Sequence, residues 1–151
     1  MSKKVTDNQI GKWFEKEVMD LLKTHAETHP IYYHRLLDSH AAGRLVSTQL
    51  TDLIVITPRV GTSFLELKAS MKYKSASEAG KSLFRPAQIG KARMLVRAGQ
   101  IPYCLFYDGE DDYVELWEIP VLIDKRPKEK TRPIFRTRLH NLIEYLFEVL
   151  V

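Results

Sequence analysis

Two neighbouring apolar segments joined by a short turn constrain the fold of this chain more than any other feature. Residues 50–57 are rich in β-branched side chains and almost continuously hydrophobic, as expected of a central strand. Pro58 and Gly61 supply turn residues, so residues 63–69 return as the hairpin partner. The sequence therefore predicts a sheet built around this hairpin.

The remaining elements follow from hydrophobic periodicity and from proline and glycine positions. Apolar residues recur at helical spacing from Ile10, which predicts a helix to about residue 25 with Asp7 or Asn8 as its N-cap. Pro86 suits the first position of a second helix, which runs to about residue 98 and is stopped by Gly99. Further strands are predicted at residues 31–37, 101–107 and 113–119, a last helix at about 138–151, a loop at 70–84 and irregular structure at 120–136.

This order of elements indicates the fold class. The chain has 151 residues, of which 44% are hydrophobic, enough for one domain with a substantial core. We expect a single domain, residues 1–151, with an α/β or α+β architecture. Its central mixed sheet of five strands would be flanked by helices in the order helix, three strands, helix, two strands, helix.

Composition also indicates the cellular setting. No apolar run approaches the length of a membrane span, and the first residues are polar, so we expect no membrane partner and no secretion. Cys104 is the single cysteine and cannot form an internal disulfide, which favours a reducing compartment. Its apolar surroundings predict a buried thiol.

The strongest candidates for chemistry lie on the predicted hairpin. Glu66 and Lys68 point to the same face, because side chains two apart on a strand share a side. Asp52, Glu66 and the backbone carbonyl of Leu67 offer converging oxygen ligands of the kind that Mg²⁺ requires. Lys68 would stabilise charge on a phosphate or position a water. The alternative is a cross-strand ion pair at a sheet edge, since Glu-x-Lys is a common triplet.

Charge is unevenly distributed along the chain. The formal net charge is +4, which allows nucleic acid as a partner without demanding it. Basic residues dominate after the candidate site, whereas the acidic turn at residues 108–112 should repel phosphate. The basic positions that could bind a DNA backbone are Arg35, Arg44, Lys72, Lys74, Lys81, Arg85 and Lys91.

An ordered set of residues resembles a known constellation: Glu15, Asp52, Glu66, Leu67, Lys68 and Gln88. An acidic residue on the first helix, an Asp at a strand start, a Glu-x-Lys on the next strand and a Gln opening the following helix are found in the PD-(D/E)XK nuclease superfamily. Within it, the chain is most similar to the Holliday-junction resolvases of the archaeal and RecU types. The resemblance covers residues 8–119. Thr51 replaces the family's proline, which binds no metal.

The resemblance implies a restriction-endonuclease-like core and a Mg²⁺-dependent DNA endonuclease, with Mn²⁺ as a substitute ion. Asp52, Glu66 and the Leu67 carbonyl would bind the ion, and Glu15 would complete the site directly or through water. Lys68 would be the catalytic lysine. Gln88 would orient Lys68, the water or the DNA.

The resemblance also implies a substrate and partners. The enzyme would resolve four-way junctions in DNA recombination and repair, as a homodimer joined through the C-terminal helix or an edge strand. It would act in the cytoplasm of a bacterial, archaeal or phage-infected cell. Relatives also use a hydroxyl-bearing segment upstream of the metal-binding Asp, for which Ser39, Ser47 and Thr48 are candidates.

Three alternatives remain open from the sequence. The same chemistry could serve duplex, flap or single-stranded DNA. The fold could be retained in a non-catalytic DNA-binding protein. Lastly, Asp52 and Lys68 could form a buried ion pair in a scaffold without metal, where either substitution would destabilise folding.

Overall fold

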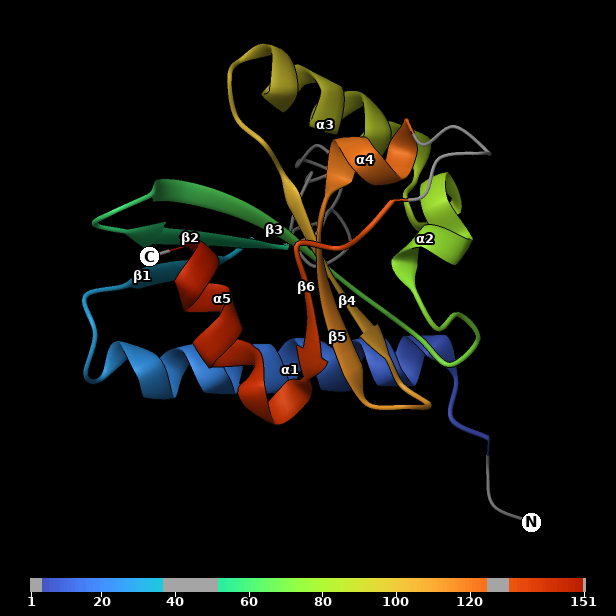
Figure 1. Ribbon diagram of the computed structural model, residues 1–151, viewed down its shortest axis with the longest axis horizontal. Coiled ribbons are helices and arrows are strands. Elements are labelled where there is room, and N and C mark those ends of the chain that lie inside the picture. Colours follow the sequence, from blue (N-terminus) through green and yellow to red (C-terminus); the bar gives the residue numbers. More distant parts are fainter. Residues whose placement is uncertain (1–3, 37–51, 125–130, 151) are drawn as a thin grey trace.

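The computed structural model describes residues 4–36, 52–124 and 131–150, and shows an α/β protein with one six-stranded mixed sheet (Figure 1). The strands lie in chain order: β1 (Tyr32–Arg35), β2 (Leu53–Thr57), β3 (Gly61–Ser70), β4 (Tyr103–Asp108), β5 (Tyr113–Glu118) and β6 (Phe135–Arg138). Among these strands only β3 and β4 pair in parallel. A parallel pair needs a long crossover, and the chain supplies one between Ser70 and Tyr103.

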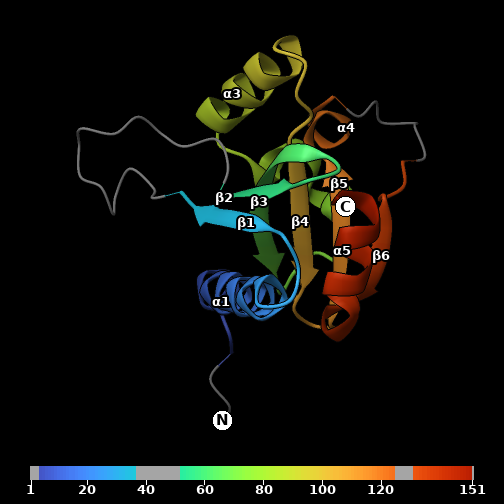
Figure 2. The same ribbon diagram turned by 90° about the vertical axis from the view of Figure 1, so that its left-hand side faces the viewer.

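Helices cover both faces of the sheet. The long helix α1 (Asp7–Ala26) and the last helix α5 (Leu142–Leu150) pack on one face. Three helices lie on the other face: α2 (Ala76–Ala79), α3 (Pro86–Arg97) and α4 (Ile119–Ile123). Figure 2 shows α1 below the strands and α3 and α4 above them. The sheet is therefore the middle layer, and residues that alternate along a strand belong to different cores.

Each face has its own apolar cluster. Phe14, Leu53 and Leu65 belong to the cluster under α1 and α5, whereas Phe106 and Trp117 belong to the one under α2 to α4. The predicted burial of the free thiol is confirmed, because Cys104 lies in the second cluster with no exposed surface. Within the described ranges, no helix is both long enough and apolar enough to cross a membrane.

The first helix begins as predicted but is capped differently. Thr6, and not Asp7 or Asn8, is the N-cap, and it forms a capping box in which Gln9 and Thr6 each bind the other's backbone N–H. Asp7 instead accepts a hydrogen bond from the backbone N–H of Met71, which follows β3. This contact ties the start of α1 to the end of the long central strand.

The second long helix matches the sequence prediction closely. Pro86 is its first residue, and Gly99 follows its end with a φ of +85°, a conformation that glycine adopts without strain. Gly61, at the hairpin turn, has a φ of +80° for the same reason. Turn chemistry and helix ends were thus readable from single residues.

The prediction of five strands was wrong, because the structure has six. The additional strand, β6, begins in the segment expected to be irregular and ends at the expected start of the last helix; Phe135 and Thr137 are buried, while Arg136 and Arg138 are exposed. Two short helices were also missed: α4, which begins at the last residue of the predicted 113–119 strand and continues into the 120–136 segment, and α2, within the predicted 70–84 loop. The last helix begins at Leu142, after a 3₁₀ turn that starts at Leu139.

Candidate active site

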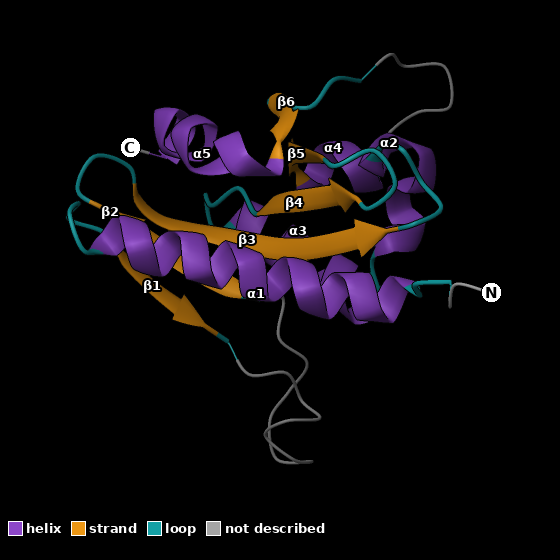
Figure 3. Cartoon of the chain, turned by 90° about the horizontal axis from the view of Figure 1, so that it is seen from below, coloured by secondary structure: helices purple, strands orange, loops and turns teal. Residues whose placement is uncertain are grey.

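The start of β2, the middle of β3 and the start of α3 meet on one face of the sheet. Alternation along β3 places Leu65 in the cluster under α1, and therefore Glu66 and Lys68 on the opposite face, beneath α3. Figure 3 shows β3 as a long strand crossing the middle of the molecule. The predicted shared face of Glu66 and Lys68 is confirmed. The sheet-edge interpretation is wrong, because β3 is an interior strand with β2 and β4 on its two sides.

Glu66 is a buried carboxylate with only part of its hydrogen-bonding capacity satisfied. Its side chain receives two donors at Oε1: the Gln88 amide nitrogen at 2.9 Å and the Lys68 ammonium at 3.1 Å. Oε2 is fully buried and has no hydrogen-bond partner. The residue as a whole is 2% exposed. A carboxylate oxygen without a donor in such a place is costly and points to a missing ligand.

Burial changes the acidity of this carboxylate. Loss of solvation and the neighbouring Asp52 charge raise the pKa of Glu66 to about 8, whereas Lys68 and Gln88 act in the opposite direction. The Asp52 effect also shows that the two carboxylates are close enough to repel one another. Two carboxylates that disfavour each other's charge form an environment that a cation would stabilise.

Asp52 is anchored by the backbone of β3. The Leu67 N–H donates to Asp52 Oδ2 at 2.7 Å, and the Asp52 N–H donates to the Leu65 carbonyl at 3.1 Å. Asp52 therefore sits directly before β2 with its carboxylate held against β3. Because the Leu67 N–H orients Asp52, Leu67 contributes to the site through its amide, while its carbonyl as a metal ligand stays a prediction.

Gln88 connects the helix to the strand. Its Oε1 accepts a hydrogen bond from the Arg85 N–H at 3.0 Å, which caps α3, and its Nε2 donates to Glu66. The helix cap therefore decides which end of the amide faces the carboxylate. The sequence placed Gln88 near the site, and the structure brings it into direct contact with Glu66.

Glu15 lies on α1 and forms an ion pair with Arg35 of β1. Its role as a further metal ligand stays a prediction. Over residues 4–36, 52–124 and 131–150, no group of three or more His, Cys, Asp or Glu side chains is close enough to hold a metal ion. The pair of Asp52 and Glu66, with the unpartnered Oε2, nevertheless fits a divalent cation whose remaining ligands are water or phosphate, as Mg²⁺ prefers.

The predicted basic residues differ in their availability. Lys72, Lys81 and Arg85 are exposed on the segment between β3 and α3. Lys74 instead contacts the acidic turn, at 2.9 Å from Glu110 and 2.8 Å from Asp111. Arg35 is engaged with Glu15. Arg44, Ser39, Ser47 and Thr48 lie outside the described residues.

Two contributors were not anticipated from the sequence. Phe84 is buried, and its ring lies 5.8 Å from the Lys68 ammonium, which limits the directions that this lysine can take. Glu115 is a second buried carboxylate on the same face, but hydrogen bonds reach it from Ser75, Ala76, Trp117 and Arg136. Glu115 is a saturated anchor for α2 and differs in this from Glu66, whose Oε2 has no hydrogen-bond partner; Asp108 Oδ2, at the end of β4, is likewise buried without one.

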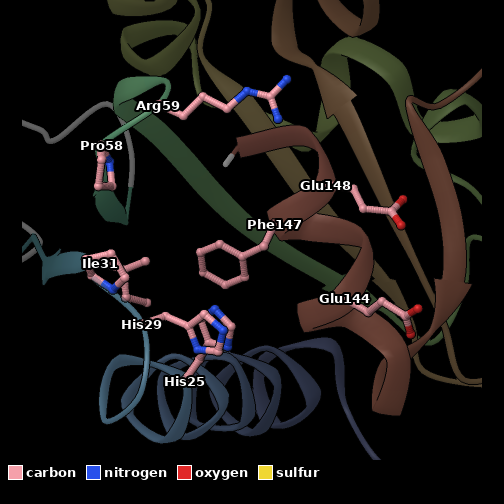
Figure 4. A pocket seen from close by; sticks show the side chains of 9 residues that line it. His25, His29, Ile31, Pro58, Arg59, Glu144, Phe147 and Glu148 are labelled. Carbon is pink, nitrogen blue, oxygen red and sulfur yellow. The ribbon is translucent and has the colours of Figure 1, made fainter.

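A separate cavity of about 500 Å³ lies between the β2–β3 turn, the end of α1 and α5 (Figure 4). His25 stacks on His29 with ring centroids 3.8 Å apart and on Phe147 at 4.1 Å. Burial and the neighbouring His29 lower the pKa of His25. These rings pack face to face as a wall of the cavity, which shares no lining residue with the carboxylate site.

A scan against protein-family models matches no family, and a search of curated proteins finds no relative of this chain.

Proposed function

We propose that this chain is a metal-dependent DNA endonuclease of the resolvase type, which hydrolyses phosphodiester bonds at four-way junctions. The observation that supports it most is the state of Glu66. A carboxylate 2% exposed, with one oxygen unpartnered and a second carboxylate beside it, destabilises a fold unless a cation uses it. Mg²⁺, or Mn²⁺ in its place, is the ion that this oxygen-donor chemistry fits best.

The protein residues have separate tasks in this mechanism. A divalent ion, when bound, would polarise the scissile phosphate and lower the pKa of the attacking water. Asp52 and Glu66 would supply its protein oxygens. Lys68, 3.1 Å from Glu66, holds a positive charge at the same place and would stabilise the charge that develops on the phosphate. Gln88 fixes the position of Glu66 through its amide donor.

The order of elements supports a restriction-endonuclease-like core as part of the proposal. The candidate residues occur in the order implied by the resemblance. They lie on a first helix, on a three-stranded antiparallel unit and on the helix of the crossover that leads to a parallel fourth strand. Opposing-strand cleavage at a junction would require a homodimer. The same site would also serve a related nuclease acting on duplex, flap or single-stranded DNA.

A non-catalytic role is less consistent with Glu66. In a scaffold, the unpartnered oxygen would destabilise the fold without any compensating interaction, whereas the saturated contacts of Glu115 show how a structural acid is accommodated on the same face. A decayed nuclease retained for DNA binding would have no reason to keep that oxygen unpartnered.

Cleavage of a synthetic four-way junction tests the proposal. Wild-type protein should cut the junction when Mg²⁺ or Mn²⁺ is added and should be inactive in chelator. Glu66→Ala should lose cleavage by several orders of magnitude, because it removes a proposed metal ligand. Glu148→Ala, an exposed change on α5, is the matched control and should cut like wild type.

Absence of cleavage of junction, flap, duplex and single strand by wild type with either ion would reject the nuclease proposal. If the protein cuts flap or duplex DNA and leaves the junction uncut, the proposed chemistry stands and the proposed substrate is wrong.

A further inference from the structure

Beside the proposed site, part of the sheet is open to solvent and carries rings and apolar side chains instead of charges. We call it the hairpin face and define it by two rows of residues that are neighbours across β1, β2 and β3. One row is His34, Ile54 and Phe64, and the other is Tyr32, Ile56 and Thr62.

All six side chains point to the same side as Glu66. Tyr33, Val55 and Leu65 alternate with them and pack in the cluster under α1. The side chains buried by α3 and α4 on this side come from β4 and β5, among them Phe106 and Trp117. Tyr32 is 59% exposed and Ile56 39% exposed, so the hairpin face is accessible.

The hairpin face continues directly from the proposed site. The Leu36 N–H donates to the Asp52 carbonyl, and the Asp52 N–H donates to the Leu65 carbonyl, so β1, β2 and β3 remain adjacent up to Asp52 and Glu66. Phe64 and Glu66 are two residues apart, which is about 7 Å along a strand. Whatever is bound at Glu66 therefore extends onto the hairpin face if it runs toward the turn.

The chemistry of the hairpin face suits bases better than phosphates. Its six residues carry no acidic or basic side chain other than His34. Aromatic and apolar side chains are the surfaces on which unpaired bases stack. Positive charge instead stands at the end next to the proposed site, where Lys68 lies 3.1 Å from Glu66. A DNA backbone held beside Glu66, with its bases on the hairpin face, fits this distribution.

The spacing of the rows selects an unstacked strand. Successive rows are about 7 Å apart. Successive bases on one strand of a duplex are about 3.4 Å apart, half of that distance. A base on each row therefore requires a strand whose bases have left the stack.

The size of the hairpin face argues against a second copy of the chain as its occupant. Three strands and two rows cover about 14 Å by 14 Å, or roughly 200 Å². A stable protein interface buries about 800 Å² on each partner. Two unpaired bases are a better match for this area.

We propose that the hairpin face binds the unpaired bases of the DNA strand that enters the carboxylate site. This rests on the proposed nuclease function and adds to it a preference for DNA with unpaired nucleotides next to the scissile phosphate. Tyr32, an aromatic ring that is 59% exposed, is the principal stacking residue. It is a specificity-determining residue and takes no part in hydrolysis.

Binding of a fluorescein-labelled 12-nucleotide oligothymidylate, followed by anisotropy in chelator, tests the hairpin face without cleavage. Wild type should bind it more tightly than a labelled 12-base-pair duplex. Tyr32→Ala should weaken oligothymidylate binding about tenfold or more, because a stacked ring is removed, with little effect on the duplex. Tyr32→Phe keeps the ring and should bind like wild type, as should Tyr145→Ala, an exposed tyrosine on α5.

The cleavage assay separates this inference from the proposed function. With Mg²⁺, Tyr32→Ala should cut a forked substrate with an unpaired arm more slowly than wild type and a fully paired junction at the wild-type rate. If Tyr32→Ala binds oligothymidylate as tightly as wild type does, the proposed role of the hairpin face is wrong, and the nuclease proposal is unaffected. A wild-type dimer that Tyr32→Ala converts to monomer in light scattering would assign the face to a second copy and overturn it too. If wild type cuts none of the junction, forked, flap, duplex and single-stranded substrates with either ion, the nuclease proposal and this inference both fail.

Discussion

The carboxylate of Glu66 is the side chain on which the proposed chemistry depends most. Alternation predicted that Glu66 shares a face with Lys68, because a strand period of two is independent of tertiary contacts, while its proposed role as a metal ligand, left open by the spacing, came from the resemblance. Its burial, its unpartnered oxygen and its raised pKa depend on α3 and Phe84 closing over β3, which no local pattern encodes. Glu15 illustrates the same limit, since its ion pair with Arg35 joins two elements across the fold.

The raised pKa predicts how stability depends on pH. Folding raises the pKa of Glu66 from 4.5 to about 8, so the folded protein holds one more proton than the unfolded chain between these values. The free energy of unfolding contributed by this group is therefore fully present below about pH 4.5 and is lost as pH rises through about 8. Glu66→Gln mimics the protonated form and should remove this dependence.

Thermal unfolding of metal-free protein between pH 5 and pH 9 measures this pH dependence of stability. The melting temperature of Glu66→Gln should fall less than that of wild type and should equal or exceed it at pH 9. Glu148→Gln should keep the wild-type slope. A Glu66→Gln protein that is several kcal/mol less stable than wild type at pH 8 would favour a scaffold held by the Glu66–Lys68 ion pair.

At the scale of elements, α3 and β3 are joined by one amide. Gln88 uses its oxygen to cap the helix at Arg85 and its nitrogen to bind Glu66. The position of the helix and the state of the carboxylate are therefore coupled through a single side chain.

Two substitutions at Gln88 should separate these tasks. Gln88→Glu keeps an acceptor for the Arg85 N–H but places a negative charge against Glu66, which raises the pKa of Glu66 further. Each unit of rise in this pKa lowers the ionised fraction of Glu66 at pH 7 about tenfold. Cleavage at pH 7 should therefore fall about tenfold for each unit and should recover at higher pH. Gln88→Ala also loses the cap, at a cost of about 1 kcal/mol.

Cleavage rates from pH 6 to pH 9 and urea midpoints for both variants provide the measurement. The midpoint of Gln88→Glu should stay near wild type while that of Gln88→Ala falls. Wild-type cleavage by Gln88→Glu at pH 7 would show that the amide donor is dispensable.

Elements were predictable in proportion to their length. The helices α1 and α3 show several turns of hydrophobic periodicity and clear end signals, and both were anticipated to within a few residues. The four residues of β6 offer only two inward positions, Phe135 and Thr137, amid charged neighbours. Their pairing is decided by β5, whose free side they complete, and not by a pattern of their own.

At the scale of the molecule, as far as the structure describes it, basic side chains of one segment differ in whether a carboxylate pairs with them. Lys72, Lys81 and Arg85 are exposed on the segment that links β3 to α3, whereas Lys74 on the same segment turns to Glu110 and Asp111. From the sequence, all four residues were predicted to bind the DNA backbone, because composition does not show which basic side chain lies close to a carboxylate.

Neutralising the exposed cations should weaken DNA binding through counterion release. The triple variant Lys72→Gln, Lys81→Gln, Arg85→Gln should bind DNA more weakly at low salt. Its plot of log affinity against log salt should flatten by about 0.9 for each duplex phosphate that the protein no longer neutralises. Lys74→Gln is the control, since its charge already faces two carboxylates, and should keep the wild-type slope. The fluorescence anisotropy of a labelled junction in chelator measures the salt dependence of both variants. A slope of the triple variant equal to that of wild type would show that the DNA does not bind at these three residues.

The single parallel pair among the described strands has a consequence for how such a chain can diverge. Joining β3 to β4 in parallel obliges residues 71–102 to cross over the sheet, and this crossover carries the exposed cations, Phe84 and Gln88 over Glu66. The hairpin that holds Asp52, Glu66 and Lys68 is made without it. Under the proposed function, lengthening or rewriting the stretch between Lys72 and Leu83 would therefore alter how the DNA backbone is held while leaving the proposed metal-binding residues in place. Backbone contacts and the proposed chemistry can evolve as separate traits in this architecture.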